Sequence, residues 1–393
     1  MRKINIFDTT LRDGEQAPDY KMCKKDKIII AKKLDEMGVD VIEAGFASSN
    51  DKDNDATCEI AKVVKNARVV SLTICRKKDI DIAYEAVKNA KYPGIHIFIA
   101  TSDIHIKDKL KSTREKVLED VSKYVSYAKS KCDYIEFSLE DATRTDKDYA
   151  CKVIDAAIDA GATVINIPDT VGFITPEEFA EFLMYIKNNS RICEVQMSVH
   201  CHNDLGLATS NTLTAIQCGA NQVECTVNGI GERAGNTALE QVVAVLKTRK
   251  NLFDAYTNVD TTKIKDISNT VVKATGNFVQ KNYPVVGFNA FRHEAGIHQD
   301  GVIKNPETYE IMNPKDYGVN VCGIVLGIHS GKSAVIKKMI DLGYNPDFYD
   351  VIGITNDLKN YFEDNDFITN EIFISIVSIN RKKEYCKVLN CGY

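Results

Sequence analysis

The chain has 393 residues, of which 44% are hydrophobic and 27% charged, and its net charge is -5. This composition is typical of a globular protein with a large core, and it lacks the Lys or Arg blocks of a nucleic-acid-binding arm. Neither a signal peptide nor a bilayer-spanning apolar segment is recognisable, so we expect a cytoplasmic protein without membrane contact. The twelve cysteines form no Cys-x-x-Cys pair, which indicates reduced thiols.

Short apolar runs alternate with amphipathic stretches over about the first 250 residues, as expected of one large α/β domain. This alternation predicts a (β/α)8 barrel, an α/β fold, followed by a smaller region. The alternative, a doubly wound open sheet, lacks its usual Gly-x-Gly-x-x-Gly after the first strand. We predict strands at residues 4–7, 41–44, 69–73, 95–100, 134–138, 164–168, 196–200 and 222–226, and helices at 24–37, 54–64, 80–89, 114–129, 148–159, 176–187, 207–218 and 238–247.

The alternation stops near Ser268, and residues 276–322 are rich in Gly, Asn and Pro. Three further helical patterns follow, at residues 334–342, 352–363 and 370–377. We therefore predict three parts, which are a catalytic barrel over 1–268, a linker or lid segment over 269–322, and a small helical C-terminal subdomain over 323–393.

Metal-ligating side chains are predicted at the mouth of the barrel. His200 and His202 lie on one face of the seventh strand, so both imidazoles can bind one divalent cation. Asp13, after the first strand, opens onto the same mouth and completes a set of two His and one carboxylate. Asn236, after the eighth strand, offers a further oxygen. The alternatives are hydrogen-bonded core histidines, a loop carboxylate and a turn residue; zinc, manganese or, less well, magnesium suits the ligands.

Other polar residues at this mouth suit acid–base and anion chemistry. Arg12 remains protonated and could stabilise an oxyanion, although a structural ion pair would explain it equally well. Glu140 and Glu232 are the carboxylates best placed for proton transfer, although each alone would pass as a solvated loop acid. His298 lies in a Gly-flanked segment that suits a mobile lid, but a lone His is usually structural. A Gly-rich loop that could approach a ligand closely contains Gly229, Gly231 and Gly235.

Three segments resemble the DRE-TIM metallolyase superfamily. They are FDTTLRDGEQ (7–16), HCHNDLG (200–206) and GIGERAGN (229–236). Within it the chain is similar to the 2-isopropylmalate synthase/homocitrate synthase family, from the first strand through Gly331. The match to the isopropylmalate-forming members is carried by FIATSDIH (98–105), EFSLEDATR (136–144), NIPDTVG (166–172) and HEAGIHQDG (293–301).

The resemblance implies condensation of acetyl-CoA with a 2-oxo acid, followed by thioester hydrolysis. The acceptor it implies is 2-oxoisovalerate, which gives 2-isopropylmalate in the first committed step of leucine biosynthesis. Asp13, His200 and His202 match the metal ligands of the family, and Asn236 matches a fourth protein contact. The glycine-rich loop is expected to contact acetyl-CoA.

The resemblance also implies roles for residues around the metal. Arg12 would stabilise oxyanion charge, and Thr170 would hydrogen-bond the carboxylate of the oxo acid. Glu140 and Glu232 match active-site acids. His298 matches a residue delivered from the partner subunit, which implies a homodimer with a domain-swapped linker and C-terminal subdomain.

Departures from the family pattern leave the acceptor open. Leu139 stands where a smaller Ala is usual, near the expected pocket for the side chain of the oxo acid, and Ile74 also departs. A homocitrate synthase using 2-oxoglutarate and a citramalate synthase using pyruvate are therefore alternatives. A hydroxyacyl-CoA lyase is disfavoured because Cys225 lies on a predicted strand rather than in a flexible Gly-Cys loop. A non-catalytic binding protein is disfavoured because every matched motif residue is present.

Many members of this family carry a further C-terminal domain that binds leucine. The sequence ends at Tyr393, so we expect it to lack this regulatory domain. Either the protein is a leucine-insensitive form or the sequence is a part of a longer chain.

Overall fold

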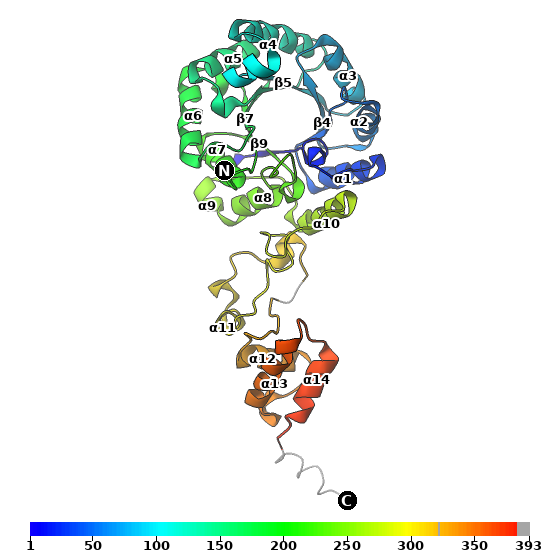
Figure 1. The fold of residues 1–393 in the computed structure, drawn as a ribbon, viewed down its shortest axis with the longest axis vertical. Helices are drawn as coiled ribbons and strands as arrows, with labels where there is room; N and C mark the ends of the chain where they lie inside the picture. The colour runs from blue at the N-terminus through cyan, green and yellow to red at the C-terminus, as the bar shows by residue number, and fades with distance from the viewer. Residues whose placement is uncertain (321–322, 383–393) are drawn as a thin grey trace, which may run out of the picture. The chain divides into compact units, whose positions relative to one another are not determined.

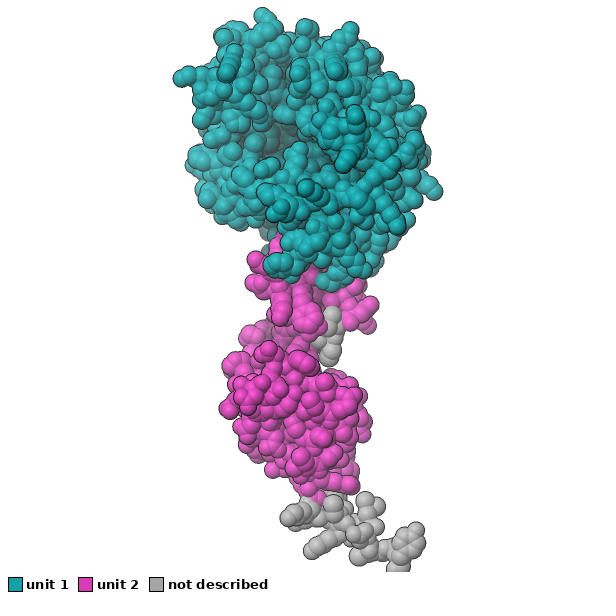
Figure 2. Space-filling view, turned by 45° about the vertical axis from the view of Figure 1, so that its right-hand side comes forward, with its two compact units in different colours: residues 1–279 teal, residues 280–393 magenta. Residues whose placement is uncertain are grey.

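The computed structural model describes residues 1–320 and 323–382. The chain divides into two compact units, Met1–Val279 and Gln280–Tyr393, which Figure 2 draws in different colours. Each unit is described by itself below. None of the helices in the described residues has the length and apolar character that a membrane crossing requires.

The first unit is a closed barrel of eight parallel strands surrounded by helices, as predicted (Figure 1). Neighbouring strands in the barrel are also consecutive in the sequence, except for β9 and β2, which pair to close it. The strands are β2 (Asn5–Asp8), β3 (Val41–Gly45), β4 (Arg68–Ile74), β5 (Pro93–Ala100), β6 (Ile135–Glu140), β7 (Val164–Asp169), β8 (Gln196–Cys201) and β9 (Gln222–Cys225). The helices that follow them are α1 (Lys24–Met37), α2 (Asp51–Val63), α3 (Lys77–Val87), α4 (Arg114–Lys129), α5 (Lys147–Asp159), α6 (Pro176–Asn189), α7 (Ala208–Cys218) and α8 (Leu239–Thr248).

Local sequence signals set several of the helix ends. Gly38, Gly161 and Gly219 follow α1, α5 and α7 closely and have φ angles of 90°, 101° and 115°, a left-handed conformation that suits glycine. At the start of α6, Thr175 and Glu178 form a capping box, which satisfies backbone N–H groups of the first turn. Such turns lead the chain from a helix back to the next barrel strand. In a barrel of this kind, the C-terminal ends of all the strands open onto one mouth.

The first compact unit runs to Val279 and includes a helix that follows the predicted strand–helix alternation. The helix α10 (Ile264–Thr275) packs on α1 and buries Ile264, Ile267 and Val271. The strand–helix alternation ends before α10, but the apolar face of α10 packs against the barrel unit. A second small sheet, in which β1 (Arg2–Lys3) pairs with β10 (Ala255–Tyr256), also lies outside the predicted elements.

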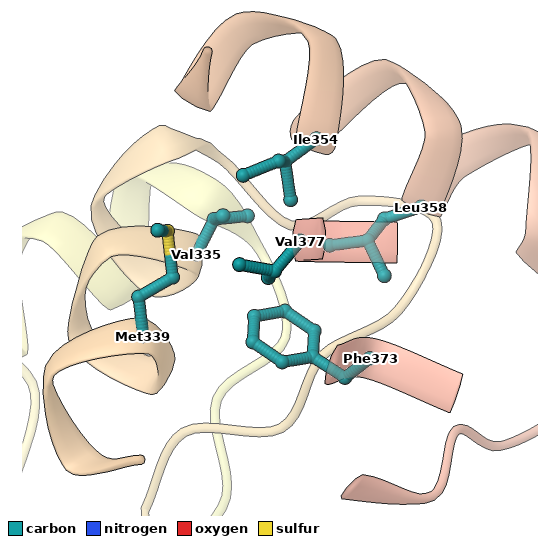
Figure 3. Packing of buried hydrophobic residues seen from close by; sticks show 6 residues of the cluster. All are labelled: Val335, Met339, Ile354, Leu358, Phe373 and Val377. Atoms are coloured by element: carbon teal, nitrogen blue, oxygen red, sulfur yellow. The ribbon is translucent and has the colours of Figure 1, made fainter. Parts of the chain in front are cut away.

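The second unit contains the four helices α11 (Gly296–Lys304), α12 (Lys332–Asp341), α13 (Val351–Asp364) and α14 (Asn370–Ile379). The last three match the predicted helical patterns, whereas α11 lies within the predicted linker. Residues 383–393 of the predicted subdomain lie outside the described residues. The apolar core of the second unit, drawn in Figure 3, consists of Val335, Met339, Ile354, Leu358, Phe373 and Val377.

Candidate active site

The three predicted metal ligands meet at the mouth of the barrel. His200 lies near the end of β8, which closes at the buried Cys201, and His202 follows directly; Asp13 comes from the loop after β2. The Nε2 atoms of the two imidazoles are 3.0 Å apart, and each lies 3.8 Å from Oδ2 of Asp13. All three side chains are buried, so the barrel gathers one acidic and two imidazole groups in one small space.

These residues fit the divalent cation that the sequence predicts. Asn236 pairs with His202 through a backbone bridge, and its Nδ2 donates to Oδ1 of Asp13 at 2.7 Å. Its Oδ1 is buried and has no hydrogen-bond partner among the described residues, which leaves an oxygen available for a cation. The two nitrogen and one or two oxygen atoms form a donor set that borderline divalent metals accept.

Electrostatics keeps Asp13 and His202 in the protonation states that bind metals. Burial raises the pKa of Asp13, but the nearby Arg12 guanidinium and the two imidazoles outweigh it and hold this pKa below its usual range. Burial, together with His200, lowers the pKa of His202 to about 3. For His200, burial acts downward, yet the Glu224 carboxylate raises the pKa. Asp13 is therefore ionised and His202 neutral, the states in which each binds metals.

Arg12 is fixed beside the metal-binding group. Its Nη1 donates to Oδ2 of Asp13 at 2.7 Å, and its Nε donates to Oε2 of Glu43 at 2.5 Å. The hydroxyl of Thr9 also donates to Glu43, at 2.6 Å. Charge-assisted hydrogen bonds of this kind hold the guanidinium rigidly, so Arg12 presents a fixed positive charge at the cavity.

A layer of polar side chains lies beneath the mouth. His96 on β5 bonds through Nδ1 to Glu43 and through Nε2 to the hydroxyl of Ser138, both at 2.7 Å. Burial lowers the pKa of His96, but Glu43 outweighs it and raises this pKa to about 9. Asn166 on β7 also donates to Ser138. Sequence reasoning missed His96; the signal was a single His within an otherwise apolar strand, on the face that alternation turns inward.

The cavity at the mouth has a volume of about 280 Å³. Its lining includes Arg12, the three predicted metal ligands, Glu140, Thr170 and Glu232, so the barrel brings these candidates together. Thr170 Oγ1 accepts a hydrogen bond from the backbone N–H of Asp141 at 3.0 Å. Phe46, directly after β3, and Leu72 and Phe98, on the neighbouring strands β4 and β5, form an apolar wall of the cavity, and Pro168 on β7 also lines it.

Leu139 is absent from the lining of this cavity, and its contact with the substrate stays a prediction. Its neighbours Ser138 and Glu140 line the cavity, and side chains alternate along a strand. Leu139 therefore lies on the opposite face of β6, where it is fully buried.

The glycine-rich loop is packed tightly around the metal-binding group. A Cβ on Gly231 would lie 2.1 Å from Nδ2 of Asn236, and one on Gly235 would lie 2.0 Å from the carbonyl oxygen of Gly229. Gly235 also has a φ of 91°. None of the three glycines lines the cavity. Close packing within the loop explains why glycine stands at these positions. The contact of the three glycines with acetyl-CoA stays a prediction.

His298 belongs to the second unit, where it lies on α11. Its ring is 4.3 Å from the ring of Tyr309, and His293 lies nearby with a centroid distance of 6.5 Å from His298. His293 Nε2 is in turn 3.3 Å from Oε1 of Glu310. The predicted lid residue thus sits in a cluster of ring side chains.

Two protein-family models match this chain. The HMGL-like family model matches residues 3–271, and the model "Homocitrate synthase post-HMGL domain-like" matches residues 285–366. The 2-isopropylmalate synthase of Bacillus pumilus is 47% identical over 378 residues, which cover 96% of this chain and 73% of that protein. This chain belongs to the 2-isopropylmalate synthase family. Members of this family are acyltransferases.

Another relative is the 2-isopropylmalate synthase of Aquifex aeolicus, 52% identical over 344 residues. The chain spans 66% of that relative's length and 73% of the Bacillus pumilus protein. Among solved structures, the hydroxymethylglutaryl-CoA lyase of Pseudomonas aeruginosa aligns with a TM-score of 0.61 at 19% identity, over 71% of this chain and 95% of that one. This likeness shows that the barrel of the 2-isopropylmalate synthase family is shared with those lyases.

Proposed function

We propose that this protein condenses acetyl-CoA with 2-oxoisovalerate and water to give 2-isopropylmalate and CoA. The observation that carries the proposal is a single cavity with two unlike ends. Arg12 and the cluster of Asp13, His200 and His202 form a charged end, and Phe46 with Leu72 lies in an apolar wall. A branched 2-oxo acid has the same division between its polar and hydrocarbon ends.

The charged end suits the keto acid group of the acceptor. A divalent cation held by Asp13, His200 and His202, with Asn236 beside it, would supply Lewis acidity that makes the keto carbon electrophilic. Arg12 would stabilise the negative charge that grows on the keto oxygen. Thr170 uses its oxygen to accept from Asp141, so its hydroxyl hydrogen remains to donate to the substrate carboxylate.

The remaining polar residues suit the proton transfers. Glu140 would take a proton from the acetyl methyl group, whose carbon then forms a bond to the keto carbon. Glu232 and the partner subunit's His298 would return a proton to the new alkoxide. Water then cleaves the thioester and CoA leaves. This assignment implies a homodimer with exchanged linkers, and the loop of Gly229, Gly231 and Gly235 is proposed to contact acetyl-CoA.

The apolar wall favours a branched hydrocarbon acceptor over the alternatives. Phe46 and Phe98 meet edge to face with centroids 6.4 Å apart, which makes a firm surface. A second carboxylate, as in 2-oxoglutarate, would lose its hydration against these rings without gaining a partner. The methyl group of pyruvate would leave part of the wall uncovered and so lose burial free energy.

Release of free thiol from acetyl-CoA tests this proposal directly. The purified metal-loaded protein is assayed with 2-oxoisovalerate, 2-oxoglutarate and pyruvate in parallel. We expect the highest kcat/KM with 2-oxoisovalerate. A preference for pyruvate or 2-oxoglutarate would refute the acceptor assignment, and absence of acceptor-dependent thiol release with all three would refute the condensation itself.

A further inference from the structure

Glu224 lies directly behind one of the metal-binding histidines and has no role in the reaction described above. Its Oε2 accepts a hydrogen bond from Nδ1 of His200 at 2.8 Å. The carboxylate is buried on β9, and its Oε1 has no partner among the described residues, with Nε2 of His96 4.0 Å away. A buried carboxylate with a free oxygen is costly unless it serves a partner.

The strand pairing explains why these two residues meet. On β8 and β9, Ser198 pairs with Gln222 and Val199 pairs with Val223. Continuing this register by one step sets His200 opposite Glu224. Both side chains then point into the barrel, so the contact is set by backbone pairing rather than by a flexible loop.

The hydrogen bond fixes the state of the His200 ring. A carboxylate accepts only, so Nδ1 of His200 carries a hydrogen, and in the neutral ring Nε2 carries the lone pair. That lone pair faces Oδ2 of Asp13 and Nε2 of His202. The other imidazole lacks such support, because Nδ1 of His202 is buried without a hydrogen-bond partner among the described residues. The two histidines are therefore oriented differently by the protein.

We propose that Glu224 is the positioning residue of the metal centre, which holds His200 in the tautomer and ring orientation that a cation requires. The inference rests on the metal site of the proposed function. Carboxylates that accept from the second nitrogen of a metal-binding His raise its basicity and restrict its rotation, and their loss typically weakens metal binding about 10- to 100-fold. His200 is accordingly the preorganised ligand, and His202 adjusts to the bound cation.

Glu136 provides a matched control within the same barrel interior. It lies on β6, and its oxygens accept from Nε2 of Gln222 at 2.9 and 3.0 Å and from the hydroxyl of Tyr134 at 3.0 Å. It makes no hydrogen bond to His200. Burial raises the pKa of Glu136 to about 8, so its neutral form is the one that Gln resembles. Glu136→Gln changes a buried acid of the same cluster while leaving the support of His200 in place.

The experiment measures Co²⁺ affinity of the metal-free full-length chain by competition with a chromophoric chelator. We compare wild type with Glu224→Leu, Glu224→Gln and Glu136→Gln. We expect affinity about 10- to 100-fold weaker for Glu224→Leu, a smaller loss for Glu224→Gln, which keeps an acceptor, and a change within about twofold for Glu136→Gln. Wild-type affinity in Glu224→Leu, or an equal loss in Glu136→Gln, would overturn the proposal.

A second measurement does not depend on how the variants fold. Nitrogen-15 NMR of labelled imidazoles in the metal-free wild-type protein reports which ring nitrogen carries hydrogen. We expect the Nδ1–H tautomer for neutral His200; the Nε2–H tautomer would refute the role of Glu224. Neither readout requires turnover. A protein with this affinity pattern but without acceptor-dependent thiol release would keep the inference and lose only the proposed synthase reaction.

Discussion

The interior of the barrel near its mouth and the core of the second unit, called the helical unit below, are both buried, but different atoms fill them. In the helical unit, six apolar side chains from three helices meet without a polar group among them (Figure 3). Near the barrel mouth, the charged groups Glu43 and His96 are buried, Arg12 is partly buried, and both Arg12 and His96 pair with Glu43. Burial stabilises the first region directly, whereas it must be offset by hydrogen bonds in the second.

The difference shows where function lies. The apolar core of the helical unit contains no polar atom that would need a hydrogen-bond partner, and an unsatisfied one there would cost free energy. The mouth instead leaves Oδ1 of Asn236 and Oε1 of Glu224 without hydrogen-bond partners among the described residues. Oδ1 of Asn236 is available to a ligand, and Oε1 of Glu224 lies 4.0 Å from Nε2 of His96. Mutations should therefore affect folding in the helical unit and chemistry at the mouth.

The largest effect on stability is expected in the helical unit. Phe373 is fully buried at the centre of its core. Phe373→Ala removes apolar contacts and leaves a cavity, so the free energy of unfolding of this unit should fall by about 3–5 kcal/mol. Hydrogen exchange of the amides in α12, α13 and α14 measures this loss locally.

A control variant and a measurement of metal affinity test whether this loss is local. Ile379→Ala is the control, because Ile379 is 80% exposed and should change stability by less than about 0.5 kcal/mol. Co²⁺ affinity of the Phe373→Ala protein should stay at the wild-type value, because the metal ligands belong to the barrel unit. Protection unchanged in the helices of the variant would show that Phe373 does not support this core.

At the mouth, Arg12→Ala should affect turnover far more than folding. Loss of a preorganised positive charge beside a developing oxyanion typically costs about 10²- to 10³-fold in kcat. Metal content, measured by elemental analysis, should remain. Arg114→Ala is the matched control, because Arg114 is an exposed arginine that pairs with Asp103 away from the cavity. Wild-type kcat in Arg12→Ala would remove Arg12 from the mechanism.

The smallest expected effect is a pH dependence of barrel stability. Burial raises the pKa of Asp8 to about 7, although two hydrogen bonds from Thr10 oppose the shift. The folded state therefore keeps a proton that the unfolded chain, with an ordinary pKa of 3.8, has released. The contribution of Asp8 to stability is present below pH 4 and is lost as the pH rises towards 7, by up to about 1.4 kcal/mol per pH unit.

Asp8→Asn removes this titration. Between pH 5 and pH 8 the stability of the variant relative to wild type should rise by about 2 kcal/mol, as measured by urea unfolding at each pH. In Asp103→Asn the relative stability should stay flat over the same range, because the Arg114 contact lowers the pKa of Asp103 and confines its titration to acid. A flat profile for Asp8→Asn would show that Asp8 is ionised in the folded barrel.

Strand and helix periodicity predicted the barrel because every strand is followed by a helix, and strand alternation placed His200 and His202 on one face. By the same alternation Leu139 lies on the outer face of β6, because Ser138 and Glu140 face inward, and its contact with the substrate stays a prediction. What the sequence did not reveal depends on pairing between strands. The contact between Glu224 and His200 requires the register of two strands, which periodicity within one strand does not supply.

The first compact unit continues to Val279, beyond the last predicted strand–helix repeat, for a related reason. The helix α10 follows the eighth strand–helix repeat and adds no strand, so alternation gives no signal for it. Its apolar face packs against α1, a contact between segments more than two hundred residues apart. Such packing is specified by the folded barrel and not by local sequence.

Chelation and reconstitution test the central claim most directly, namely that Asp13, His200 and His202 hold a cation on which condensation depends. The protein is stripped with a chelator until elemental analysis finds no divalent metal, and acceptor-dependent thiol release is measured before and after Mn²⁺, Zn²⁺ or Mg²⁺ is returned. We predict activity lost in the stripped protein and restored by at least one of these cations. Full activity in demonstrably metal-free protein would contradict the account.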